Sequence, residues 1–100
     1  MGRNTQKRLW SVLTDNMDIC IYTGSHTVER HHVFGGSRKA LSERYGFIAP
    51  LAPYLHPNGT QADKQAKNID DDLKRRCQEY YERHYGSREQ FIQEFGKSYI

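Results

Sequence analysis

The chain has 100 residues, with 15 Lys and Arg against 12 Asp and Glu and a formal net charge of +3. That length allows one domain with one modest core. Aromatic residues make up 12 % of the chain, which argues against an intrinsically disordered protein. No apolar run is long enough to cross a bilayer, and the basic segment 1–8 lacks the apolar stretch of a secretory signal. We therefore expect a soluble cytoplasmic protein with no membrane partner.

Charge and cysteine usage narrow the partners and the compartment. A net charge of +3 is a weak electrostatic signature for nucleic-acid binding. The acidic run 70–72 and the basic run 74–76 are typical of a solvated helix face. The two cysteines, Cys20 and Cys77, do not form a disulfide framework, so we expect a reducing compartment.

The first half of the chain predicts a hairpin. Residues 1–17 form an N-terminal extension before the first regular element. The alternating segment 18–22 (DICIY) favours a strand, because its β-branched and aromatic residues suit a pleated strand. Residues 23–26 are turn formers, and 27–34 again suit a strand that contains two adjacent histidines.

The segment after the hairpin is irregular in pattern. Residues 35–37 form a loop, and a helical turn is predicted over 42–46, where a glycine closes it. The apolar segment 47–51 contains Pro50, which argues against a long central strand. Residues 57–59 form another turn.

The strongest helical signal is a stripe of residues spaced three or four apart: Ala62, Ala66, Ile69, Leu73, Cys77, Tyr80 and His84. This stripe predicts an amphipathic helix over 60–85. Ser87 and Gln90 form a capping box that opens a second, short helix, and Gly96 ends it. We predict an α+β fold in one domain, 1–100, with its core over 18–66 and a helical part over 60–100.

The histidines are the candidates for catalytic or metal-binding residues. His26 and His84 are interpreted as surface or structural residues. Adjacent histidines such as His31 and His32 are more often incidental than functional, although a twisted strand end can bring both near one site. His56 follows just before the turn that opens the long helix. A hairpin with two histidines, followed by a helix whose start supplies a third, is the layout of a ββα-metal nuclease site.

With these residues in place, the chain resembles the HNH endonuclease family, in particular a compact group of phage-borne members. The motif begins at Glu29 and reads ERHHVFGGSRKALSERYG, and it is followed by an apolar stretch, a histidine and NG. Such proteins also end on a phrase like FGKSYI. The resemblance covers about residues 18–100, and it implies a ββα-metal core of hairpin, loop and helix.

The resemblance implies a metal-dependent endonuclease that hydrolyses DNA phosphodiester bonds. By the family pattern, His31 and His56 hold the divalent metal, and His32 is the general base that takes a proton from water. An imidazole suits proton removal at neutral pH, and the metal supplies a Lewis acid. We expect Mg²⁺ or Mn²⁺, with Ni²⁺ as a further candidate. The basic residues expected to contact DNA phosphates are Arg30, Arg38, Lys39 and Arg44.

Two departures from the family pattern concern metals. Relatives carry two Cys-x-x-Cys pairs for a structural zinc, and here residues 20–23 read CIYT and residues 52–55 read APYL. One cysteine cannot form a tetrahedral thiolate site, so we expect no structural zinc, with Cys20 packed in the core. Gln61 stands where relatives have a further histidine, and an amide is a poorer ligand for transition metals.

Two other classes of function are open. The first is a module that lost turnover and binds DNA or a host defence protein through the long helix, whose candidate contacts are Tyr80, Tyr81, Tyr85, Arg75, Arg76 and Arg83. A simpler interpretation of Tyr80 is that it belongs to the core. The second class, a structural zinc protein, is disfavoured by the cysteine count. No heptad pattern is present, so we expect a monomer or a weak dimer.

Overall fold

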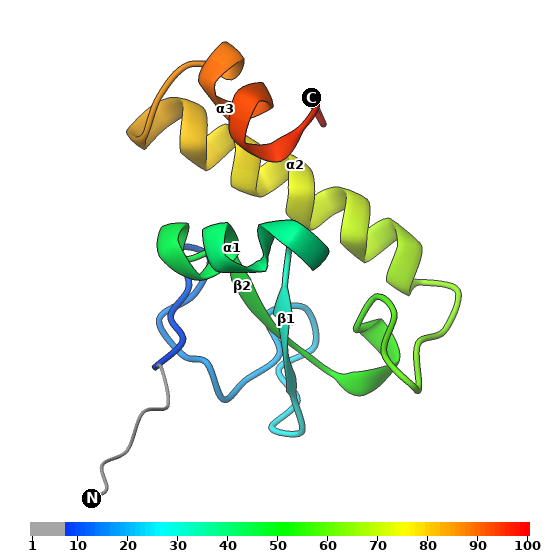
Figure 1. Cartoon of the computed structure of the whole chain (residues 1–100). Coiled ribbons are helices and arrows are strands. Elements are labelled where there is room, and N and C mark those ends of the chain that lie inside the picture. Colours follow the sequence, from blue (N-terminus) through cyan, green and yellow to red (C-terminus); the bar gives the residue numbers. More distant parts are fainter. Residues whose placement is uncertain (1–7) are drawn as a thin grey trace, which may run out of the picture.

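The computed structural model describes residues 8–100, and Figure 1 shows how they are arranged. The fold is α+β, as the sequence predicts, with a two-stranded antiparallel sheet and helices packed beside it in a small ββα-like arrangement. Residues 1–7 of the expected N-terminal extension lie outside the described part of the chain. The elements are β1 (Glu29–His32), the 3-10 turn η1 (Gly36–Arg38), α1 (Lys39–Tyr45), β2 (Ile48–Leu51), the 3-10 turn η2 (Pro53–Leu55), α2 (Ala66–His84) and α3 (Arg88–Phe95).

The sheet pairs β1 with β2, in a register that sets His31 opposite Ala49 and His32 opposite Ile48. The prediction of a strand over 18–22, and of a hairpin with 27–34, is therefore wrong. Segment 18–22 forms turns, because Cys20 bonds within its own turn: it donates to the Ser25 carbonyl at 2.8 Å and accepts from Gly24 at 2.9 Å. The Ile21 N–H donates to the Pro50 carbonyl of β2 at 3.2 Å, without a strand forming over 18–22. The alternation in 18–22 places Cys20 in the core without forming a ladder.

Helix α1 connects the two strands and begins at Lys39, three residues before the predicted start. Ser42 is buried inside it and does not cap it. Its hydroxyl donates to the Phe34 carbonyl at 2.7 Å and accepts from the Phe34 N–H at 3.0 Å, which fixes α1 against the end of β1. Gly46 ends the helix in a left-handed conformation at φ +76°, as predicted.

Helix α2 begins at Ala66, later than the start of the predicted range 60–85. Residues 60–65 form turns instead: Asp63 donates its backbone N–H to the Tyr54 carbonyl at 2.9 Å, and its side chain accepts from the Gln65 N–H at 2.7 Å. These bonds satisfy the backbone outside the helix and delay its start. The predicted apolar stripe is confirmed from Ala66 to Tyr80, since Ala66, Leu73 and Cys77 are buried, whereas its last predicted member, His84, is exposed.

The predicted capping box is confirmed at the start of α3, where the Ser87 side chain accepts from the Gln90 backbone and the Gln90 side chain accepts from the Ser87 backbone. Gly96 ends α3 in a left-handed conformation, again as predicted. In Figure 1, α3 lies against the C-terminal half of α2. Its buried Phe91 and Phe95 join an aromatic core with Phe34 and Phe47. In residues 8–100 no helix combines the length and the apolar character that crossing a membrane requires.

Candidate active site

Two histidines from separate segments meet beside the sheet. His31 belongs to β1, and His56 directly follows η2. Their ring centroids lie 5.0 Å apart, with the ring planes inclined by 64°. The turn after His56 fixes its backbone, because Gly59 donates to the His56 carbonyl at 2.9 Å and Asn58 takes a left-handed conformation at φ +64°. The structure thus brings together the two residues that the family resemblance implies as metal ligands.

His31 carries an unusual buried nitrogen. The residue is 7 % exposed, and its Nε2 atom has no hydrogen-bond partner among the described residues. The Asp70 carboxylate faces it, but Oδ1 is 3.9 Å from Nε2, which is beyond hydrogen-bonding distance. Burial lowers the pKa of His31, so the ring is neutral at neutral pH, and the neutral imidazole is the form that binds metals.

His56 is oriented by a carboxylate that the sequence analysis missed. Its Nδ1 lies 2.6 Å from Oε1 of Glu29, two residues before His31 on β1. Residues two apart on a strand face the same side, so Glu29 and His31 both face His56. A carboxylate on one ring nitrogen fixes the ring and leaves the other nitrogen, Nε2, for a ligand. The two-residue spacing between Glu29 and His31 was the available signal.

Asp70 is the second group that sequence reasoning missed, since the run 70–72 was interpreted as a solvated face. Its neighbour Asp71 is exposed and bonds Lys67, as expected for such a face. Asp70, in contrast, is half-buried between His31 and Lys74, whose Nζ lies 2.9 Å from its Oδ2. Burial works against the carboxylate, but His31 and Lys74 outweigh it and hold the pKa of Asp70 below its ordinary value.

His32 has different neighbours from His31. As the next residue on β1 it faces the opposite side of the sheet, and its Nε2 lies 2.8 Å from Oε2 of Glu43 on α1. The described structure therefore groups His31 with His56 and groups His32 with α1. A carboxylate that accepts from Nε2–H leaves Nδ1 of His32 with its lone pair.

The four basic residues expected to contact DNA divide into two kinds. Lys39 and Arg44 are exposed on α1 and form no ion pair within residues 8–100. Arg30 is paired with Asp18 at 2.9 Å on the surface. Arg38 is half-buried and joins η1 to α3, because its Nε donates to the Glu94 carbonyl at 3.1 Å. Lys39 and Arg44 are thus the residues best placed for a polyanion.

The long-helix surface expected for a protein partner is partly occupied within the chain, while Arg83 and Tyr85 are exposed. Tyr81 is buried and donates to the Glu94 carboxylate, so it belongs to the core. Tyr80 is half-buried against the same core, which agrees with the simpler interpretation of this residue. Arg75 pairs with both Asp72 and Glu79. These contacts leave a smaller free surface than the sequence indicated.

The region where relatives bind zinc is packed with apolar side chains. Cys20, Ala52 and Leu55 are buried in one core cluster, as expected for packing at these positions. Burial works to raise the pKa of Cys20, but hydrogen bonds from Thr23 and nearby backbone groups outweigh it and lower the pKa. Gln61 is exposed in the turn before α2, and its side chain forms no hydrogen bond within the described residues.

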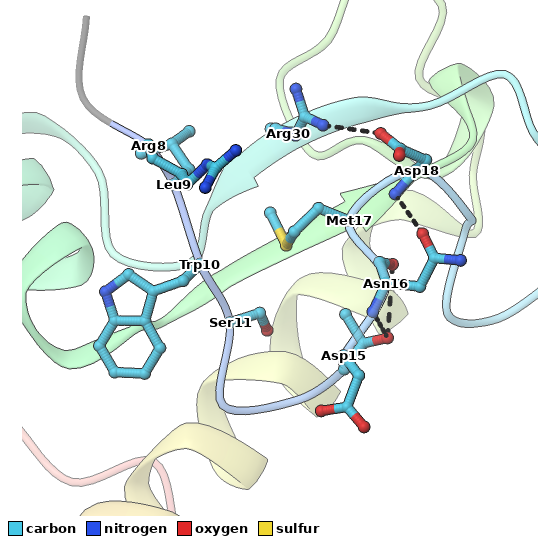
Figure 2. Close-up of a pocket in the computed structure, with 10 residues that line it drawn as sticks. Arg8, Leu9, Trp10, Ser11, Asp15, Asn16, Met17, Asp18 and Arg30 are labelled. Atoms are coloured by element: carbon cyan, nitrogen blue, oxygen red, sulfur yellow. Dashed lines mark hydrogen bonds and ion pairs between the residues drawn. The ribbon is translucent and has the colours of Figure 1, made fainter.

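One hollow of the described surface lies away from the histidine pair. It has a volume of about 900 Å³ and is lined by residues 8–11 and 14–18 and by Arg30, which faces the opposite side of β1 from His31. Figure 2 shows Arg30 paired with Asp18 across its rim and Trp10 at one end. It contains no imidazole and mixes both charge signs. We therefore place the candidate site at the histidine pair.

The donors present fit a divalent transition metal in part. Imidazole nitrogens are good ligands for such metals, and His31 offers a buried nitrogen with no other partner. His56 has the outer-shell carboxylate that metal-binding histidines commonly have. Within residues 8–100, no three His, Cys, Asp or Glu side chains already converge as ready-made ligands. Two imidazoles lie side by side, and a third donor would require a side chain to move.

In comparisons with protein-family models, with curated proteins and with solved structures, this chain finds no match. The resemblance to the HNH family therefore rests on the motif residues and on nothing beyond them.

Proposed function

We propose that this protein is a metal-dependent endonuclease that hydrolyses phosphodiester bonds of DNA, with His31 and His56 as ligands of the divalent metal. The observation that carries the proposal is the meeting of the two imidazoles, one of which has a buried Nε2 without a partner. A divalent ion held there would supply the Lewis acid that stabilises charge on the phosphate and the leaving oxygen.

The remaining roles fall to residues around this pair. Glu29 holds the His56 ring through Nδ1. His32 is the proposed general base: with Glu43 accepting from Nε2–H, its Nδ1 takes the proton from water. Because His31 and His32 face opposite sides of β1, the scissile phosphate would have to lie at the end of this strand, where both are within reach. Lys39 and Arg44 would contact neighbouring phosphates.

The test is a plasmid-nicking assay with Mg²⁺, Mn²⁺ or Ni²⁺ against EDTA, using wild type, His56→Ala and the matched control His84→Ala. His84 is an exposed histidine at the end of α2 and lies outside the proposed site. We expect nicking that needs metal, is lost in His56→Ala and persists in His84→Ala. A folded wild-type protein that fails to nick DNA in the presence of each of these metals would overturn the proposal.

A second candidate is a DNA-binding module without turnover. One observation favours it: Glu43 holds His32 on the other side of β1 from the His31–His56 pair. In that case Lys39 and Arg44 would still bind phosphates, and DNA binding would persist in EDTA. The nicking assay, run beside a gel-shift assay in EDTA, separates the two candidates.

A further inference from the structure

The gap between His31 and Asp70 has the dimensions of an incomplete ligand pair. Nε2 of His31 and Oδ1 of Asp70 are 3.9 Å apart, too far for a hydrogen bond. Two atoms that each lie about 2.1 Å from one metal ion, at angles of roughly 90–110°, are about 3.0–3.4 Å apart. A rotation of the Asp70 side chain that moves Oδ1 by less than about 1 Å would bring the two atoms to that separation.

Asp70 already has a partner that competes for its carboxylate. Lys74, one turn further along α2, lies 2.9 Å from Oδ2. Lys74 also has a second neighbour, because its Nζ is 5.6 Å from the centroid of the Tyr99 ring. The ammonium can therefore stay over the aromatic face when the carboxylate turns toward His31.

We propose that Asp70 is the third protein ligand of the metal held by His31 and His56, and that Lys74 competes with the metal for its carboxylate. The inference rests on the proposed function only for the location of the metal. Two imidazoles and one carboxylate are a donor set for Mn²⁺, Fe²⁺, Co²⁺, Ni²⁺ or Zn²⁺, whereas Mg²⁺ prefers oxygen ligands. The metal preference of this chain therefore follows from its three donors.

The test uses Co²⁺ as the probe, with isothermal titration calorimetry for affinity and visible ligand-field absorption for the donor set. The variants of the full chain are Asp70→Asn, Lys74→Gln and the matched control Asp71→Asn. Asp71 lies on the same helix and pairs with Lys67, so its variant has the same change of charge without facing His31. Circular dichroism and urea melts verify that each variant folds.

We expect Asp70→Asn to weaken Co²⁺ binding by at least about tenfold and to change the absorption spectrum. Asp71→Asn stays within about twofold of wild type. Lys74→Gln binds Co²⁺ about threefold to tenfold more tightly, because it removes the competing cation. Because loss of a nearby positive charge favours any bound cation, the changed absorption spectrum of Asp70→Asn is the readout that separates a ligand from a residue that acts through charge alone.

Equal affinities for wild type and Asp70→Asn would overturn the inference, as would weaker binding by Lys74→Gln or no binding of Co²⁺ by wild type. The two proposals fail separately. Co²⁺ binding that depends on Asp70 without any nicking supports the ligand set and contradicts the endonuclease. Metal-dependent nicking with unchanged Co²⁺ affinity in Asp70→Asn does the reverse.

Discussion

The two sides of β1 present the same side chain in opposite states. On one side, the buried His31 has no hydrogen-bond partner for Nε2 within the described residues and lies against His56. On the other side, His32 has a 2.8 Å contact with Glu43. A satisfied imidazole is stable as it stands, whereas an unsatisfied buried nitrogen costs free energy and is retained where something binds it. The difference between the two histidines, rather than their adjacency, is what points to a ligand site.

The largest effect expected from this comparison is on catalysis. His32→Ala should lower the nicking rate by about 10²–10⁴-fold, the usual contribution of a general base, while Co²⁺ affinity stays within about twofold of wild type. The control His26→Ala, in an exposed turn, should leave both unchanged. Rates measured under single-turnover conditions test this. A His32→Ala protein that nicks at the wild-type rate would show that His32 is not the general base.

Helix α1 carries Glu43, the neighbour of His32. Ser42 links this helix to the end of β1 through two hydrogen bonds with Phe34. Ser42→Ala leaves both buried Phe34 backbone groups without this partner, so we expect a loss of about 1–3 kcal/mol in the free energy of unfolding. Urea denaturation measures it, with the exposed Ser37→Ala as control. A loss no larger than that of Ser37→Ala would show that α1 is held by other contacts.

Replacing each of the two histidines by leucine should change the free energy of unfolding in opposite directions. His31→Leu removes a buried nitrogen that lacks a partner, so its free energy of unfolding without metal should equal or exceed that of wild type, by up to about 2 kcal/mol. His32→Leu breaks the contact with Glu43 and should cost about 1–2 kcal/mol. Urea melts in EDTA test both. A larger loss in His31→Leu than in His32→Leu contradicts the comparison.

The smallest effect is a dependence of stability on pH. Burial lowers the pKa of His31 in the folded state, so below the ordinary imidazole value of about 6.5 the unfolded chain binds a proton that the folded chain does not. The free energy of unfolding should therefore fall as the pH falls from about 7 to about 5, by at most about 1.4 kcal/mol per pH unit. His31→Leu should show a shallower dependence. Identical slopes for the two proteins would contradict the buried, neutral state of His31.

The helical half of the fold was predictable because its signals are local. The capping box at Ser87 and Gln90, the left-handed glycines at 46 and 96 and the apolar stripe of α2 each depend on residues within a few positions of one another. The strand pairing is not local. Segment 18–22 has the alternation of a strand, yet Cys20 bonds within its own turn, and β2 is the strand that pairs with β1, across a long connection.

The candidate site was predictable in its histidines and not in its carboxylates. His31 and His56 meet as the family resemblance implied. Asp70 looked like one member of a solvated acidic run, because its inward direction is set by the packing of α2 beside β1 and not by its neighbours in sequence. Arg38 looked free to contact DNA, yet it bonds to a carbonyl of α3, an element more than fifty residues away.

A metal site at the His31–His56 pair is tested most directly by the histidine side-chain resonances of the full chain, titrated with Mn²⁺ in ¹H–¹⁵N spectra. Paramagnetic broadening falls steeply with distance from the ion, so it reports which rings lie next to it. We predict that His31 and His56 broaden first, at low Mn²⁺ ratios, while His26 and His84 remain sharp. Equal broadening of all five histidines, or broadening that begins at His26 or His84, would contradict a metal site at the His31–His56 pair.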